Sequence, residues 1–164
     1  MGFTISKKTY IVTNQFSLMP KITFEKIINA DAQKTFDVLT NFENFENILP
    51  EFYSSITVKS TRDESSLVVE HLHLCGNEFV IMAKHFTEKP NQHKMRVIGG
   101  DIKGSYITES IIPLKDSNSL NTQTKLIINA EIKTSRGLKG TFKKFDYSSE
   151  LEKLYQKFAD VIGD

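Results

Sequence analysis

The stretch ITFEKIINADAQKTFDVLTNFENFENILPEF, residues 22–52, decides the fold of this protein. Its first part, residues 22–28, is rich in isoleucine, threonine and phenylalanine and predicts a β-strand. The stretch Asn29-Ala30-Asp31 then offers an N-cap before a helix from Ala32, and Phe36 and Leu39 follow at helical spacing. We therefore expect a first short helix directly after the strand.

A second short helix is expected immediately after the first. Phe42, Phe45 and Leu49 continue at steps of three and four residues, and the pattern stops at Pro50, which a helix interior does not tolerate. The chain therefore opens with one strand and two short helices.

Beyond residue 52 the period of the apolar residues changes to two, which is typical of strands. Short turn signals separate the segments, so they predict an antiparallel meander. The six predicted strands are 52–61, 66–75, 78–88, 92–99, 102–112 and 120–132. Residues 141–162 return to a helical period with one apolar stripe. This long C-terminal helix is the only element able to cover the apolar face of a seven-stranded sheet.

Length and composition indicate one domain, which we place at 20–164. Residues 1–19 are weakly patterned and are expected to be an extension, either disordered or preceding the true start at Met19. The net charge of +1 argues against broad capture of nucleic acid or an anionic membrane. No apolar run approaches the ~18 residues of a membrane span. The single cysteine fits a reduced compartment, so we expect a cytoplasmic protein. We also expect a monomer or weak dimer that has no cofactor.

The order of elements, the stretch 22–52 and the segment GGDIKGSYITES, residues 99–110, resemble the START-like, birch-pollen-allergen-like (SRPBCC) superfamily. The resemblance is strongest to its polyketide cyclase and coenzyme Q-binding branch and covers residues 20–163. It implies an α+β helix-grip fold, with a curved seven-stranded antiparallel sheet wrapped around the C-terminal helix. It also implies an apolar cavity for a lipid, quinone or polyketide-like molecule. The family has no invariant catalytic set to carry over.

The stretch EHLHLCGNEFVIMAKHF, residues 70–86, contains three of the four histidines. A two-residue turn at Gly76-Asn77 would place Glu70 and His85 on the cavity face as diagonal neighbours, and the other two histidines on the outer face. We expect no metal site, because a metal needs three or four ligands. Glu70 and His85 either pair inside the cavity or contact water near the open end of the sheet.

The same reasoning on alternating residues predicts which side chains line the cavity. A turn at Gly100-Asp101 pairs Met95 with Tyr106, which points Tyr106 and Thr108 inward and Glu109 to solvent. The predicted ligand-binding residues are Leu72, Phe79, Ile81, Ala83, Met95, Val97, Tyr106, Thr108, Thr124, Leu126, Ile128, Tyr147, Leu151 and Tyr155. The hydroxyl groups of the tyrosines and threonines among them either hydrogen-bond the ligand or find hydrogen-bond partners within the core.

The segment KTSRGLKGTFKK, residues 133–144, holds five basic residues and no acidic one. It leads into the start of the C-terminal helix, where the macrodipole disfavours cations. An anionic ligand or lipid headgroup at the cavity mouth would offset this unfavourable concentration of positive charge. Alternatively, the segment is a basic loop exposed to solvent.

Three functions stay open on the sequence. The first is a binding or transport protein for a hydrophobic small molecule, without catalysis. The second is a cyclase, dehydratase or hydrolase in which His85 is the acid–base group, Glu70 orients it and Tyr106 donates a hydrogen bond. This enzyme needs Glu70 and His85 within hydrogen-bond reach in one pocket. The third is a protein-interaction module that uses apolar outer-face residues such as Val80 and Met82.

Overall fold

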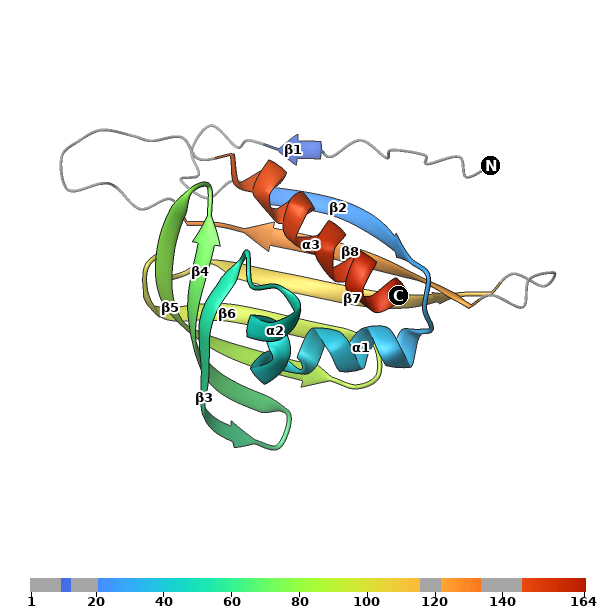
Figure 1. The fold of residues 1–164 in the computed structure, drawn as a ribbon, viewed down its shortest axis with the longest axis horizontal. Coiled ribbons are helices and arrows are strands. Elements are labelled where there is room, and N and C mark those ends of the chain that lie inside the picture. The colour runs from blue at the N-terminus through green and yellow to red at the C-terminus, as the bar shows by residue number, and fades with distance from the viewer. Residues whose placement is uncertain (1–9, 13–20, 116–121, 134–145) are drawn as a thin grey trace.

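A curved antiparallel sheet surrounds one long helix in the computed structural model, which describes residues 10–12, 21–115, 122–133 and 146–164 (Figure 1). The strands are β1 (Tyr10–Val12), β2 (Lys21–Ile28), β3 (Tyr53–Arg62), β4 (Ser65–Leu74), β5 (Asn77–Glu88), β6 (Gln92–Gly100), β7 (Tyr106–Leu114) and β8 (Gln123–Glu131). The helices are α1 (Ala32–Thr40), the 3₁₀ helix η1 (Phe42–Asn44), α2 (Phe45–Ile48) and α3 (Tyr147–Gly163).

The strands lie in the order β1-β2-β8-β7-β6-β5-β4-β3, and all neighbours are antiparallel. The predicted α+β helix-grip architecture is therefore confirmed, with seven long strands, two short helical segments after the first of them and a C-terminal helix. The three-residue strand β1 lies within the predicted N-terminal extension and adds an eighth strand by pairing with β2. Among the described residues, no helix is both long and apolar enough to cross a membrane.

Local signals in the sequence set the helix starts. The Asp31 side chain accepts a hydrogen bond from the backbone N–H of Lys34 at 2.7 Å, so the predicted N-cap of α1 is confirmed. At the start of α3, Asp146 accepts from the N–H of Ser149 at 3.0 Å. Both caps satisfy N–H groups that have no partner inside the helix.

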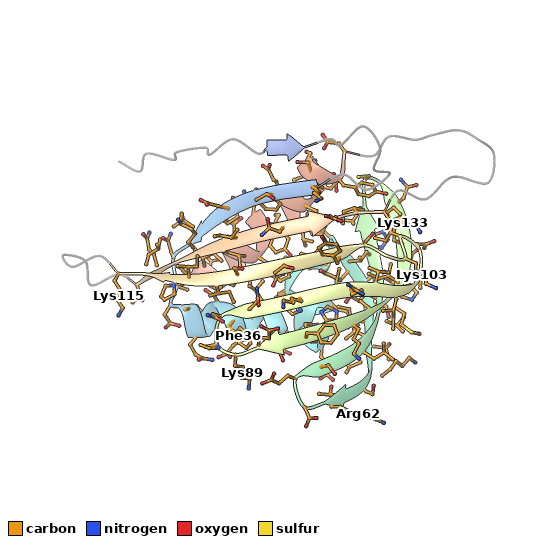
Figure 2. All side chains as sticks on the ribbon, turned by 180° about the vertical axis from the view of Figure 1, so that it is seen from behind. Phe36, Arg62, Lys89, Lys103, Lys115 and Lys133 are labelled. Atoms are coloured by element: carbon orange, nitrogen blue, oxygen red, sulfur yellow. The ribbon has the colours of Figure 1, made fainter. Side chains whose placement is uncertain are left out.

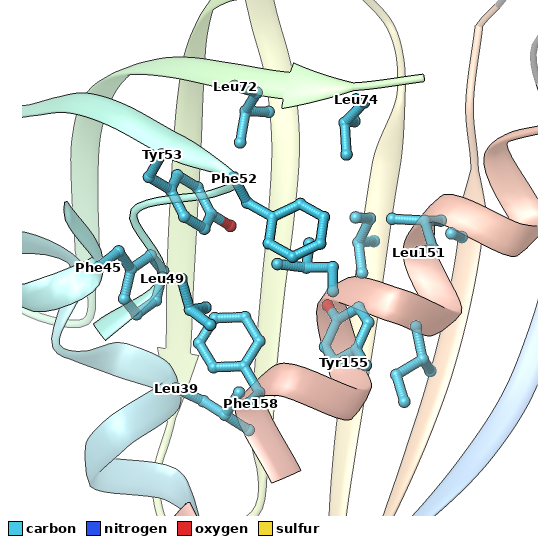
Figure 3. Close-up of a cluster of buried hydrophobic side chains, with 14 of the residues drawn as sticks. Leu39, Phe45, Leu49, Phe52, Tyr53, Leu72, Leu74, Leu151, Tyr155 and Phe158 are labelled. Carbon is cyan, nitrogen blue, oxygen red and sulfur yellow. The ribbon is translucent and has the colours of Figure 1, made fainter. Parts of the chain in front are cut away.

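The core lies between the inner face of the sheet and the apolar face of α3. Tyr155 of α3 packs edge-on against Phe24 of β2, with ring centroids 5.7 Å apart. Phe158 packs similarly on Phe45 of α2 at 5.1 Å. Such aromatic pairs stabilise a fold by ~0.5–1.5 kcal/mol beyond the area they bury. The helix and the opening unit of strand and short helices are thus joined through one aromatic cluster (Figure 3).

The β4–β5 hairpin differs from the prediction by one turn position. Its turn residues are Cys75 and Gly76, both with positive φ (53° and 72°), which matches the twist of a two-residue hairpin. Leu74 therefore pairs with Asn77, and the whole register moves by two residues. A shift of two keeps every side chain on its predicted face, so the inward placement of Glu70 and of the apolar residues around it is confirmed.

The predicted pairing of β6 with β7 is wrong by one residue, which has larger consequences. Arg96 pairs with Tyr106 and Met95 with Ile107, one residue away from the predicted register. The residues between the strands form a wide loop closed by the Val97 N–H donating to the Ser105 carbonyl at 2.9 Å, not a two-residue turn. A one-residue shift reverses the faces, so Tyr106 and Thr108 point outward. Figure 2 views the molecule from behind and shows this outer face of the sheet.

Candidate functional site

An internal cavity of about 50 Å³ lies between the sheet and α3. Its wall is mostly apolar, and the apolar lining residues are Leu39, Phe45, Leu72, Leu74, Met95, Ile102, Ile107, Ile132, Leu151, Leu154 and Phe158. The polar lining residues are Tyr53, Glu70, His85, His93, Ser105, Glu109 and Tyr155. Apolar walls with a few convergent polar groups are typical of small-molecule sites.

Five of these polar residues form one continuous line of hydrogen bonds, which we call the polar chain: Glu70, His85, His93, Glu109 and Tyr155. Its first half joins Glu70 Oε1 to His85 Nε2 at 2.6 Å and His85 Nδ1 to His93 Nε2 at 2.9 Å. The two imidazole planes differ by 2° while their centroids are 5.1 Å apart. Together with the short N–N distance, this places the rings edge to edge in one plane, as a linear N–H···N hydrogen bond requires.

The second half of the polar chain reaches the helix. His93 Nδ1 lies 2.8 Å from Glu109 Oε2, and the Tyr155 hydroxyl donates to Glu109 Oε1 at 2.5 Å. One residue comes from each of the neighbouring strands β4, β5, β6 and β7, and the last from α3. All five residues are at most 5% exposed, so each side chain depends on its neighbours rather than on water.

The hydrogen bonds of the polar chain set the number of protons that must lie between its members. Three contacts join the two carboxylates and the two imidazoles, and each hydrogen bond needs one proton between its heavy atoms. Two neutral imidazoles supply two protons, so the fully bonded chain holds one more. With both carboxylates ionised, two negative charges and one added proton leave a single net negative charge. Moving the added proton between His85 and His93 preserves every bond, so either ring can carry it.

Phe42 covers the histidine pair from one side. Its ring centroid lies 4.1 Å from that of His85 and 5.4 Å from that of His93. The histidine pair is therefore bonded to a carboxylate at each end and packed against the ring of Phe42.

Two tyrosines belong to this environment. Burial, followed by the nearby Glu109 carboxylate and its hydrogen bond, raises the pKa of Tyr155 well above its ordinary value. Burial, followed by the charges of Glu70 and Glu109, raises the pKa of Tyr53 in the same direction. Both hydroxyl groups therefore stay protonated, and that of Tyr155 donates its proton to the hydrogen bond with Glu109. Figure 3 shows them as oxygen atoms within an otherwise carbon-lined cluster.

These raised pKa values predict a loss of stability in alkali. Unfolded tyrosine ionises near pH ~10, so above that pH the unfolded chain binds fewer protons than the folded chain and stability falls as pH rises. Below it the contribution is complete. Tyr155→Phe is expected to flatten the slope of unfolding free energy against pH above ~10 by up to ~1.4 kcal/mol per pH unit. Denaturant titrations at several pH values measure that slope, and equal slopes in the two proteins would contradict the argument.

The cavity contains only part of the residue set predicted from the sequence. Glu70 and His85 line it together, and so do Leu72, Met95, Leu151 and Tyr155. Several others are buried in the core but do not line it: Phe79, Ile81, Ala83, Val97, Thr124, Leu126, Ile128 and Tyr147. Thr124 illustrates the local alternative, since its hydroxyl donates to the Ala30 carbonyl at 2.7 Å. Tyr106 and Thr108 lie on the outer face, so the structure removes the reason for assigning them to the site.

Two residues of the polar chain, His93 and Glu109, are absent from the sequence prediction. His93 had a usable signal, because it lies two residues before Met95 on a strand whose inward face was correctly assigned. Glu109 had none, because the predicted register of β7 turned it to solvent. The basic segment 133–144, apart from Lys133, lies outside the described residues. Among the residues that are described, no group of three or more His, Cys, Asp or Glu side chains is arranged to hold a metal ion.

Comparisons with known proteins agree with the architecture. No family model and no curated protein matches the chain. A START superfamily protein from Mycobacterium smegmatis matches with a TM-score of 0.67 and 14% identity, over 87% of this chain and 94% of that one. The Zhui aromatase/cyclase from Streptomyces sp. R1128 matches with 0.65 and 14%, over 88% of each chain.

A plant structure extends the same likeness. Ginseng major latex-like protein 151 from Panax ginseng matches with a TM-score of 0.63 and 16% identity, over 89% of this chain and 97% of that one. Structural similarity of this extent demonstrates a common fold, and at such low sequence identity it demonstrates the fold alone. The chain thus has the fold of START and latex-like proteins over 87–89% of its length.

Proposed function

We propose that this protein, with its START-like helix-grip fold, binds a small and mainly apolar molecule in the cavity between the sheet and α3. The observation that carries the proposal is an internal cavity with an apolar wall and a single line of polar groups. The polar groups would orient one end of the ligand, and the apolar wall would supply the affinity. A lipid, a quinone or a polyketide-like molecule fits this description.

The cavity volume sets a condition on this proposal. An engineered apolar cavity of ~150 Å³ holds benzene, and pockets for drug-sized ligands measure ~300–1,000 Å³. The cavity of about 50 Å³ is smaller than either. A ligand larger than a few water molecules therefore requires the lining side chains to move apart, and the ligand-bound form is wider than this closed one.

Filling the cavity is expected to weaken ligand binding. Leu154 lines the cavity from α3, so Leu154→Phe places a ring where the ligand would lie. We expect at least a tenfold loss of affinity, or ~1.4 kcal/mol, for the neutral apolar dye N-phenyl-1-naphthylamine, measured by fluorescence titration. The control is Val80→Phe, which adds the same ring on the outer face where Val80 is 41% exposed.

The two variants decide the proposal together. Wild-type protein and Val80→Phe should bind the dye alike, and mass spectrometry of an organic extract of the wild-type protein should reveal a co-purifying apolar molecule. Failure of the wild-type protein to bind any apolar molecule would refute the proposed function. Equal binding by Leu154→Phe would place the site elsewhere.

A second candidate function is acid–base catalysis in the same cavity. The observation that favours it is the 2.6 Å contact between Glu70 Oε1 and His85 Nε2, a carboxylate that orients a histidine of the cavity wall. His85 Nδ1 is bonded to His93, so His85 would act on a substrate only when that contact opens. Tyr155, rather than Tyr106, lies where it can serve as a donor. Mass spectrometry of a ligand recovered after incubation separates the two functions, since a binding protein returns its ligand unchanged and a cyclase or dehydratase returns product.

A further inference from the structure

We infer that the cavity selects its ligand by charge: it accepts a molecule whose buried polar end is a protonated amine, and it excludes carboxylates. The inference rests on the proposed function, because it concerns the ligand of the same cavity. It is carried by the proton count of the polar chain, by the atoms of that chain which remain open to the cavity, and by the aromatic rings around them.

The charge balance of the wall is negative. The titratable groups that face the cavity are Tyr53 on β3 and the five members of the polar chain on β4 to β7 and α3. The tyrosines are neutral, and with both carboxylates ionised the polar chain carries one net negative charge. No lysine or arginine is present among the described lining residues. A buried charge needs an opposite charge nearby, so the cavity wall favours a cation and disfavours an anion.

Two polar atoms are positioned to contact such a cation. Glu70 uses Oε1 to bond His85, while its Oε2 has no hydrogen-bond partner within the described part of the chain. The Tyr53 hydroxyl is likewise without a hydrogen-bond partner there. Glu109 differs, because His93 and Tyr155 each take one of its oxygens. Glu70 Oε2 is therefore the carboxylate oxygen available to accept a hydrogen bond from an ammonium group.

Aromatic rings form part of the same cavity wall. Phe45, Tyr53, Tyr155 and Phe158 all line the cavity, and Tyr53 packs on Phe45 with ring centroids 5.1 Å apart. Ring faces attract ammonium groups and repel carboxylates, because the quadrupole of the ring is negative on its face. The rings and the polar chain thus favour the same sign of ligand charge, and they replace part of the hydration that an ammonium group loses on entry.

A series of three ligands tests the inference. Decylamine, decanol and decanoate share one alkyl chain and differ in the charge of the head group at pH ~7.5. Each is used to displace N-phenyl-1-naphthylamine from the full-length protein. We expect decylamine to displace the dye at a concentration at least tenfold lower than decanol, and decanoate at one at least tenfold higher, each step being ~1.4 kcal/mol.

Two variants assign the preference to the cavity. Glu70→Gln keeps the size of the side chain and an acceptor for His85 but removes one negative charge, so the advantage of decylamine over decanol should fall at least tenfold. Glu78→Gln removes a charge from the outer face, where Glu78 pairs with His71 at 3.2 Å, and should leave the preference unchanged. If Glu70→Gln does not fold, the wild-type series still decides the question.

The outcomes of the series distinguish the inference from the proposed function. Charge selectivity would be overturned by any of three results: equal displacement by all three ligands, tighter binding of decanoate, or dye binding that none of them displaces. In each case the dye still binds, so the proposed apolar site is retained. A protein that binds neither the dye nor any of the three ligands would refute both. An amine preference that Glu78→Gln also abolishes would indicate surface binding and would overturn the inference.

Discussion

Alanine in place of Glu70 is expected to lower the free energy of unfolding by about 3–5 kcal/mol, the range observed when one partner of a buried charged pair is removed. Glu70 and His85 are both 2% exposed and lie 2.6 Å apart. The truncated side chain removes the acceptor of His85 Nε2 and one of the two carboxylates of the polar chain. Urea titrations followed by circular dichroism measure the difference.

The chain supplies its own control for this experiment. His71 and Glu78 form a second Glu–His pair on the same two strands, at 3.2 Å, but on the outer face with 36% and 51% of their side chains exposed. Glu78→Ala is expected to change stability by no more than about 0–1 kcal/mol, because water solvates both partners. Similar losses in the two variants would contradict the view that burial makes the polar chain essential to the fold.

Gly100→Ala is expected to destabilise the protein by about 2–5 kcal/mol. Gly100 has a φ of +79°, a conformation that disfavours a side chain by ~1–2 kcal/mol. A Cβ atom there would overlap the carbonyl oxygen of Val80 and approach Ile81 Cα to 3.2 Å. Because both contacts are backbone, the strands must separate to relieve them, which adds ~1–3 kcal/mol.

Gly76→Ala is the matched control for the glycine experiment. Gly76 also has a positive φ of +72°, but a Cβ atom at this position would meet nothing within 4 Å. Only the backbone preference is lost, so we expect about 1–2 kcal/mol. Thermal or urea unfolding of the two variants isolates the effect of close backbone approach at Gly100. A larger loss for Gly76→Ala would show that the β5–β6 contact is adaptable.

The Gly100 region also explains why part of the site escaped prediction from the sequence. Asp101 donates its N–H to the Val80 carbonyl at 2.9 Å and accepts from the Val80 N–H through Oδ2 at 2.8 Å. These contacts join residues 21 positions apart in the chain and hold the loop before β7 wide. Turn propensities of neighbouring residues do not encode such long-range contacts. The prediction from them was a tight turn, which reversed the faces of β7 and turned Glu109 outward.

The β4–β5 hairpin shows the opposite case. There the turn was misplaced by one position and the register by two, yet Glu70 and His85 were still assigned to the inner face. The alternation of apolar and polar residues along each strand fixes the face independently of the pairing. What the pattern did not provide was the 2.6 Å contact itself. Glu70 pairs with Ile81, four residues from His85, and the side chains meet only within the closed core.

The amino-acid sequence by itself determined the order of elements, the cap at Asp31, the helix that covers the sheet and the inner faces of β4, β5, β6 and β8. These features depend on local periodicity and capping, which neighbouring residues encode. Only the tertiary structure decided the register of β7 and the assembly of Glu70, His85, His93, Glu109 and Tyr155 into one polar chain. Four strands and a helix each contribute one of those residues, and hydrogen bonds between segments distant in the chain form only when sheet curvature and helix packing bring them together.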